Sequence, residues 1–235
     1  MDRYPPIAEH GMVGDLQTAA LVSSGGTVDW WCAPRFDSPS IFASLLDSER
    51  GGHCHLAAEH PEGDGMTVRQ LYLSDTAILI TRFMGPGGVG EVADFMPPIH
   101  APTPTDRHTL IRVARVVRGS LPFVFSCRPR FDYGRAPHEL ELADAHAAVL
   151  RGPGTDLHVQ SSTGIRLHAD GDDVTARFTL SAGQAAVVVL TTSDAGARPR
   201  RCPPWPPSPR TSRSAAASGC RGCAPAPTAV AGRRW

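Results

Sequence analysis

The feature that most constrains this chain is the spacing of its turns. Between residues 18 and 192, short runs rich in β-branched and apolar residues are interrupted by turn sequences about every 8 to 12 residues, which is typical of an antiparallel sandwich. Phe123, Phe125 and Cys127 alternate with Val124 and Ser126, as expected of a strand with one buried face. We therefore predict an all-β fold, a large antiparallel sandwich of two sheets.

The segments predicted to form strands share this composition and are bounded by Gly, Pro, Asp or Ser. They are Thr18–Ser23, Thr27–Cys32, Gly52–Ala57, Met66–Leu73, Thr76–Met84, Val89–Met96, Thr109–Val117, Leu121–Phe131, Glu139–Ala143, Ala147–Arg151, Asp156–Gln160, Ile165–Ala169, Val174–Leu180 and Ala185–Thr192.

One short segment favours a helix instead. Ser38 followed by Pro39 is typical of a helix start, because the hydroxyl can cap a free amide and proline at the first position loses no hydrogen bond. Ile41, Phe42, Leu45 and Leu46 would then share one side, and the helix would end near Arg50 and Gly51. We predict one short helix here.

The two ends of the chain have different charge. Through Asp194 there are 15 arginines and 23 acidic residues, a net charge of −8, whereas from Ala195 onward there are 8 arginines and no acid. The second segment also holds 8 prolines and no strand or helix period, so it cannot bury enough apolar surface to offset its ordering entropy. We predict a folded domain over residues 1–194 and a disordered tail over 195–235, whose composition suggests a reading frame lost near Ala197 or Arg198.

A predicted hairpin delivers the candidate functional loop. Gly25 and Gly26 can turn the chain between Thr18–Ser23 and Thr27–Cys32, and the second strand carries Trp30 and Trp31. Neighbouring strand residues point to opposite sides, so at most one of these rings is expected in the core, and the other could stack on a bound ligand.

A repeated tetrapeptide, Pro-Arg-Phe-Asp, occurs at residues 34–37 and 129–132. Arginine with a carboxylate two residues later can order a loop by local ion pairing, while the phenylalanine anchors it in the core. A second interpretation is that one loop lines the rim of a binding site. The substrate-rim candidates are Trp30, Trp31, Arg35, Asp37, Arg130 and Asp132.

Several short motifs carry a family resemblance. Val13-Gly14-Asp15, Val28-Asp29-Trp30, residues 34–39, Arg82-Phe83, residues 92–97 and residues 128–134 occur in one order along the chain. Over roughly residues 5 to 195, the chain resembles the amino-terminal domain of bacterial glycoside hydrolase family 15 proteins, in the trehalase and glucoamylase-like branch.

This resemblance implies a large β-sandwich, of the supersandwich type, that packs against a catalytic (α/α)6 barrel. Such enzymes hydrolyse α-glucosidic bonds with inversion, and the two glutamates that do so lie on the barrel. Nothing in residues 198–235 resembles the barrel's first helices. Residues 1–235 alone are therefore expected to be inactive, with no catalytic residue and no cofactor.

Three functions stay open at this point. The chain could be a non-catalytic scaffold domain, a free-standing module that binds trehalose or an α-glucan through Trp30 or Trp31 and Arg35, or a scaffold completed by a separately encoded barrel. The acidic residues Glu91 and Asp94, like Glu139 and Glu141, are expected at outward positions of strands, where charge is most often found.

Other sites are less well supported by the sequence. His53 and His55 would share a strand face near His60, but strand geometry fixes only two ligands, so we predict no metal site. Cys220 and Cys223 do not define one either. The tail arginines lack a folded platform for specific nucleic-acid binding. No apolar run reaches the 18 or so residues of a membrane span and no signal peptide is evident, so a cytoplasmic location with reduced thiols is expected.

Overall fold

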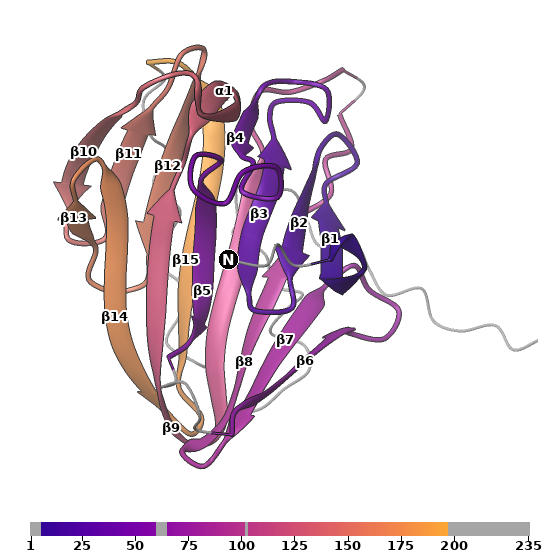
Figure 1. Ribbon diagram of the computed structural model, residues 1–235, viewed down its shortest axis with the longest axis vertical. Helices are drawn as coiled ribbons and strands as arrows, with labels where there is room; N and C mark the ends of the chain where they lie inside the picture. Colours follow the sequence, from indigo (N-terminus) through magenta and orange to yellow (C-terminus); the bar gives the residue numbers. More distant parts are fainter. Residues whose placement is uncertain (1–5, 60–64, 102, 197–235) are drawn as a thin grey trace, which may run out of the picture.

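The computed structural model describes residues 6–59, 65–101 and 103–196, and Figure 1 shows them as a β-protein with little helix. The predicted disordered tail lies outside these residues, apart from its first two. The all-β prediction is confirmed.

The strands follow the chain in order, with one 3-10 turn at the start and one short helical turn, α1. They are η1 (Ile7–Glu9), β1 (His10–Gly14), β2 (Ala19–Ser23), β3 (Thr27–Cys32), β4 (Ser40–Phe42), β5 (His53–Ala58), β6 (Thr67–Tyr72), β7 (Leu79–Gly85), β8 (Gly88–Phe95), β9 (Thr109–Arg128), α1 (Phe131–Gly134), β10 (Glu139–Asp144), β11 (Ala147–Arg151), β12 (Thr155–Ser161), β13 (His168–Asp170), β14 (Asp173–Ser181) and β15 (Ala185–Asp194).

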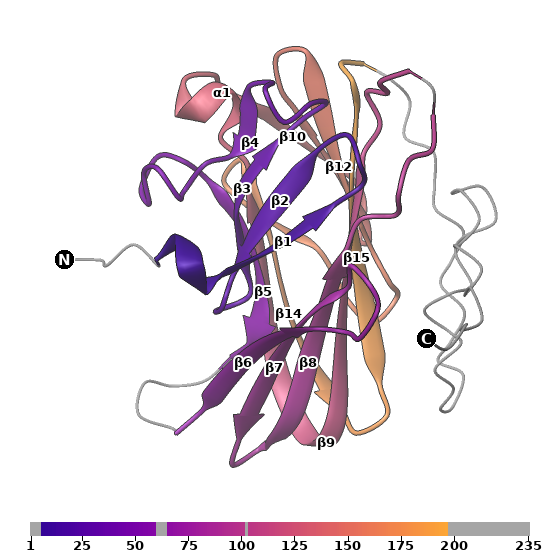
Figure 2. The same ribbon diagram turned by 90° about the vertical axis from the view of Figure 1, so that its right-hand side faces the viewer.

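Strand β9 joins two facing layers into one hydrogen-bonded network. Its first half pairs with β8 and β15, in the layer that also holds β6, β7, β12, β11 and β10. Its second half pairs with β5 and β14, in the layer that holds β1 to β4 and β13. Every pairing is antiparallel, and Figure 2 shows the two layers from the side.

The alternation of buried residues along β9 changes phase where the strand changes layer. Even-numbered positions from Leu110 to Val116 are buried in the first half, and odd-numbered positions from Leu121 to Cys127 in the second. Between them the four residues 117–120 are exposed, and Gly119 has a φ of 78° that favours glycine. The two strands predicted from sequence, over 109–117 and 121–131, are thus one bent strand.

The helix predicted after Ser38 is wrong. Residues 40–42 form β4, which pairs with β3, and turns follow up to residue 51. Ile41 and Phe42 are both buried, and the Phe42 ring lies 6.2 Å from the Trp31 ring centroid. The Ser38 hydroxyl accepts a hydrogen bond from the Arg35 backbone N–H, in a turn that precedes the strand. Burial of adjacent side chains in the sheet has overridden the local capping signal.

The prediction that Glu91 and Asp94 point outward is also wrong. Glu91 is 1% exposed and Asp94 is fully buried. Glu91 pairs with Arg82 and Arg115, and Asp94 pairs with Arg112, so each buried carboxylate has a cationic partner. Glu139 and Glu141, in contrast, are exposed as expected.

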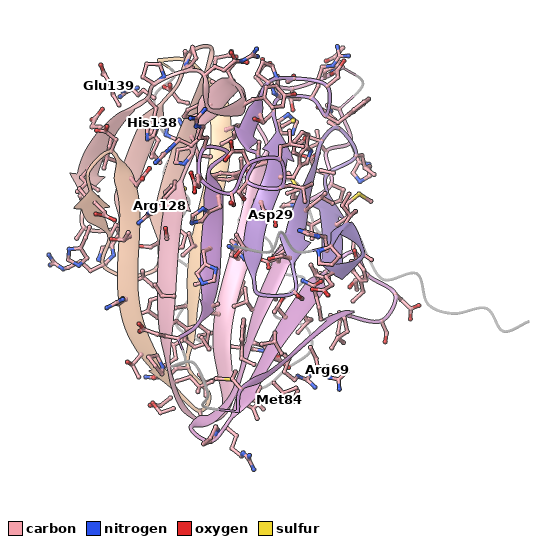
Figure 3. The ribbon with its side chains drawn as sticks, viewed as in Figure 1. Asp29, Arg69, Met84, Arg128, His138 and Glu139 are labelled. Atoms are coloured by element: carbon pink, nitrogen blue, oxygen red, sulfur yellow. The ribbon has the colours of Figure 1, made fainter. Side chains whose placement is uncertain are left out.

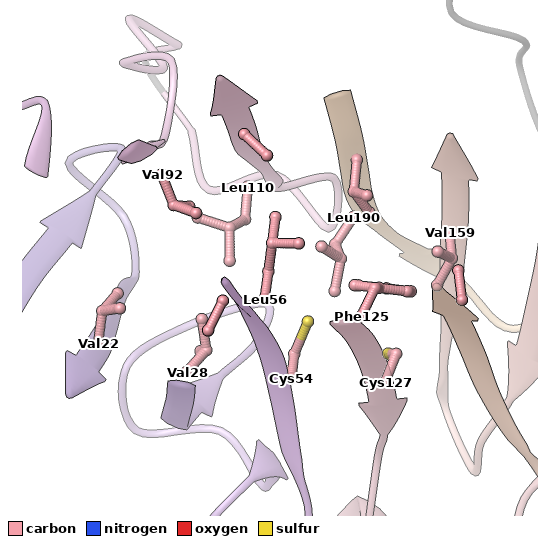
Figure 4. Packing of buried hydrophobic residues seen from close by; sticks show 14 of the residues in the cluster. Val22, Val28, Cys54, Leu56, Val92, Leu110, Phe125, Cys127, Val159 and Leu190 are labelled. Atoms are coloured by element: carbon pink, nitrogen blue, oxygen red, sulfur yellow. The ribbon is translucent and has the colours of Figure 1, made fainter. Parts of the chain in front are cut away.

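The core combines apolar side chains of both layers. Figure 4 shows part of it, with Val22 and Leu56 from one layer and Val92 and Leu190 from the other. No helix in the described ranges is long and apolar enough to cross a membrane.

Candidate functional site

Two loops that are far apart in sequence meet at one end of the sandwich. We call this the α1 end, made of the loop 33–39 and of residues 130–135 around α1 (Figures 1 and 2). The Arg130 N–H donates to the Ile41 carbonyl over 2.9 Å, and the Tyr133 N–H donates to the Ser40 hydroxyl over 3.0 Å. Strand β4 therefore fixes α1 beside the loop that carries Arg35.

Trp30 and Trp31 have different environments, as strand alternation predicts. Trp31 is fully buried and packs against Phe42, so its ring cannot stack on a sugar. Trp30 is half-buried, and its ring centroid lies 6.2 Å from that of Tyr133. Of the two tryptophans, only Trp30 belongs to the α1 end.

The first Pro-Arg-Phe-Asp copy is an exposed loop closed by its own ion pair. Arg35 donates two hydrogen bonds of 2.9 Å to Asp37, and both side chains are about half exposed. Phe36 is 73% exposed, so it does not anchor the loop in the core. The local ion pair predicted from sequence is present, and the apolar anchor is not.

In the second copy the aromatic anchor is present and the local ion pair is not. Phe131 is buried, and Arg130 forms a two-pronged pair with Asp173 at 2.7 and 2.9 Å instead of with Asp132. The hydrogen bonds that Arg130 donates to Asp173 raise the pKa of Arg130, although burial acts to lower it. Asp132 instead accepts from Arg135 at 2.7 Å.

A charged cluster surrounds Asp173 next to this loop. Arg128 reaches Asp170 at 3.0 Å, and His138 Nε2 lies 3.8 Å from Asp173. Figure 3 shows Arg128 and His138 on the same side of the molecule. These contacts tie β9 and the segment after α1 to the β13–β14 turn, and so hold α1 in place.

Tyr133 is the site residue that the sequence analysis missed. Asp132 and Tyr133 have φ values of 52° and 58°, a left-handed conformation that costs non-glycine residues about 1 kcal/mol or more each. The turn is held by the contacts of Ser40 and Ile41, and it presents the Tyr133 ring at 41% exposure. Its only sequence signal was the glycine at 134 that follows an aromatic residue.

The Tyr133 ring is held from several sides. Trp30 lies against it, and the Arg135 guanidinium lies 5.6 Å from its centroid, within range of a cation–π contact. Its hydroxyl contacts the Cys32 thiol; burial raises the pKa of Cys32, and this contact only partly offsets the effect. The α1 end thus offers a fixed aromatic ring with arginine and carboxylate groups beside it, a combination suited to contact with a sugar or a peptide.

The described chain ends at the same end of the sandwich as α1, next to the β11–β12 turn. The Gly196 N–H donates to Asp156 at the start of β12, directly after the β11–β12 turn. Gly152 in that turn packs so closely on Phe131 of α1 that an added Cβ would lie 2.7 Å from the ring. Residue 196 therefore lies beside the β11–β12 turn, at the same end of the sandwich as α1, although Figure 2 shows α1 and the end of β15 on opposite sides of that end.

The described residues contain no cluster of three or more His, Cys, Asp or Glu side chains that could hold a metal ion. His55 bonds the Thr27 hydroxyl at 2.8 Å, and burial and then Arg128 lower the pKa of His53. The third histidine of that group, His60, lies outside the described residues. Asp37 and Asp132, the carboxylates at the α1 end singled out from sequence, are each bound to an arginine.

Comparison with known proteins decides the family. The model of a family described as "Trehalase-like, N-terminal" matches residues 2–203. The chain belongs to this family.

Curated relatives of this trehalase-like N-terminal chain are considerably longer. It is 35% identical to a trehalase of Mycolicibacterium smegmatis over 81% of its own length and 31% of the relative. It is 31% identical to a trehalase of Mycobacterium tuberculosis over 80% of its length and 30% of that protein. A trehalase of Thermoplasma volcanium shows 28% identity over 72% of the chain and 27% of the relative. The chain spans about a third of the length of these proteins.

Proposed function

We propose that residues 1–194 form a non-catalytic supporting domain of a trehalase-type glycoside hydrolase of family 15. The carboxylates that hydrolyse the substrate would lie on an (α/α)6 barrel. This barrel would correspond to the two thirds of the relatives' length that the chain does not cover. The proposal is supported by the family match, by relatives that are trehalases, and by the arginine pairing of Asp37 and Asp132. The three described cysteines are free, as suits the cytoplasmic location that we also propose.

The observation that carries the orientation of this domain is the position of residue 196. Because residue 196 lies at the end of the sandwich that also carries α1, we propose that this end faces the catalytic part. Tyr133 and the loop with Phe36 would then line the entrance to the sugar pocket, with Trp30 behind them. The same surface could serve a barrel supplied in cis or as a separate chain.

A chimera tests this function. Residues 1–194 would replace the matching third of the Mycolicibacterium smegmatis trehalase, and release of glucose from trehalose would be measured. We expect an active chimera whose kcat/KM falls at least several-fold with Tyr133→Ala. Val117→Ala is the control, since Val117 is 56% exposed where β9 changes layer, and this bend lies at the opposite end of the sandwich from α1 (Figure 1). Equal effects of the two substitutions would contradict the orientation.

The chain on its own provides the complementary test. With trehalose or maltose, residues 1–235 should release no glucose. Measurable hydrolysis that persists through repeated purification would overturn the assignment of a supporting role.

A carbohydrate-binding function is the second candidate, favoured by the exposed ring of Tyr133 beside the half-buried Trp30. Calorimetric titration of the chain with trehalose and with glucose oligomers separates the two functions. Saturable heat that disappears in Tyr133→Ala would support a binding module, and no heat is expected for a supporting domain.

A further inference from the structure

Two buried cysteines face each other across neighbouring strands. Cys54 in β5 and Cys127 in β9 are direct partners in the antiparallel register, and both are fully buried. Their thiols interact with each other, and Figure 4 shows the side chains next to each other. Both are free thiols in this structure.

The two thiols are not equivalent, because Arg112 approaches only one of them closely. Its Nη1 lies 3.7 Å from Cys54 Sγ. Burial raises the pKa of the Cys54 thiol, but contact with Cys127 and the Arg112 charge more than compensate, so that pKa is lowered. Burial and the neighbouring Cys54 raise the pKa of Cys127. The pair therefore combines a thiol activated toward thiolate with a thiol that keeps its proton.

The geometry of such a pair is compatible with a covalent bond. Directly opposed residues of antiparallel strands have Cα atoms about 4.5 to 5.5 Å apart, within the range of about 4.4 to 6.8 Å that disulfides span. Cβ atoms of opposed residues are about 4.5 to 5.5 Å apart, and a disulfide needs about 3.8 Å. A modest approach of β5 and β9 would be sufficient.

We propose that Cys54 and Cys127 form a reversible disulfide when the protein meets hydrogen peroxide. The Cys54 thiolate attacks the peroxide oxygen, the O–O bond breaks, and hydroxide leaves and takes up a proton as water, which leaves Cys54 as a sulfenic acid. The Cys127 sulfur then attacks the Cys54 sulfur, and the sulfenic oxygen leaves as a second water with the thiol proton. One peroxide is reduced to two waters, and two thiols are oxidised to one disulfide.

The consequence would be a link next to the α1 end. Cys127 lies three residues before Arg130, and Gly52, two residues before Cys54, packs directly against Arg128 and Arg130. The bond would join strands β5 and β9 and close a loop of more than 70 residues between Cys54 and Cys127, and a loop of that length gives a large loss of unfolded-state entropy. Oxidation should stabilise the part of the sandwich that holds α1.

Peptide mapping tests the proposal on the full chain. The folded protein is treated with hydrogen peroxide, blocked with an alkylating agent and digested with trypsin without reduction. We expect a linked species of peptides 51–69 and 119–130, lighter by two hydrogen atoms than its parts, which disappears with dithiothreitol. Linkage of the tail cysteines would give different peptides. The proposal fails if, after peroxide treatment and unfolding, both cysteines are still free thiols that the alkylating agent modifies. The two side chains would then only pack in the core.

Thermal unfolding gives an independent readout. The oxidised protein should melt about 10 °C higher than the reduced protein, judged from the length of the closed loop. Cys32→Ala is the matched control, since Cys32 is also buried but its described thiol contact is with Tyr133. This variant should keep both the linked peptides and the rise in melting temperature. Cys127→Ala should lose both, and a shift that persists in Cys127→Ala would overturn the proposal even if Cys54→Ala does not fold.

Discussion

Replacing Asp94 by asparagine should destabilise the sandwich strongly. Arg112 and Asp94 are both fully buried, and the guanidinium donates to Asp94 from Nε at 2.7 Å and from Nη2 at 3.3 Å. It also donates to the carbonyls of Cys54 and Gly26, each at 2.7 Å, and so connects the two layers. Burial acts to lower the pKa of Arg112, but the charges of Asp94 and Cys54 and the hydrogen bonds to them together outweigh it, and the pKa is raised.

The expected loss of folding free energy comes from the positive charge of Arg112, which the substitution leaves buried without a negative partner. Asparagine keeps the shape but removes the negative charge, and a buried guanidinium facing only neutral acceptors costs about 3 to 5 kcal/mol. Total stabilities of domains are about 5 to 15 kcal/mol, so the loss is a large fraction. For a domain of this size it corresponds to a fall in Tm of roughly 6 to 20 °C.

Asp37→Asn is the matched control for this substitution. The Arg35–Asp37 pair has the same two-pronged geometry, but its side chains are 56% and 52% exposed. Exposed pairs contribute about 0 to 1 kcal/mol, since water solvates either partner alone. Urea unfolding followed by tryptophan fluorescence would compare the two. If Asp94→Asn costs no more than Asp37→Asn, the argument from burial is refuted.

Three further substitutions test other parts of the structure. Burial acts to raise the pKa of Asp15, but its hydrogen bonds outweigh this and the pKa is lowered. The stabilisation that Asp15 contributes is therefore present above about pH 4 and is lost as the pH falls through the lowered pKa. Asp15→Asn should flatten this part of the acid-unfolding curve. The Tyr72 hydroxyl hydrogen-bonds both the N–H and the C=O of Met12 on the open edge of β1. Tyr72→Phe should therefore lower the free energy of unfolding in urea by about 1 to 2 kcal/mol and raise self-association measured by light scattering. Unchanged values would contradict this role of Tyr72. Gly134→Ala should lower Tm more than Gly171→Ala, because both have positive φ but only at Gly134 would the new Cβ meet a backbone oxygen, at 2.6 Å; equal losses would show that the clash is relieved.

The motifs that indicate the family turn out to be largely structural. Asp15 bonds the buried His108 at 2.6 Å and the backbone N–H groups of residues 17 and 18. Asp94, in the motif at residues 92–97, accepts hydrogen bonds from Arg112. The sequence showed these residues only as separate short pieces, because the partner of Asp94, Arg112, lies 18 residues away and the partner of Asp15, His108, lies 93 residues away.

The candidate site was only partly predictable for the same reason. Arg35, Asp37 and Trp30 were found because a hairpin and a loop place them next to each other in sequence. Tyr133 was missed, since its exposure depends on a left-handed turn that Ser40 and Ile41 hold from another strand. The two identical tetrapeptides differ in structure because Asp173 is available to Arg130 and no such residue pairs with Arg35 in the structure.

By itself, the sequence determined the fold class, the positions of most strands and the family, because turn residues and alternating apolar residues act locally. Tertiary structure decided which charges are buried, that residues 40–42 are a strand and not a helix, and which groups meet at the α1 end. These outcomes depend on burial energy, and a side chain's burial is set by strands that lie far away in the chain.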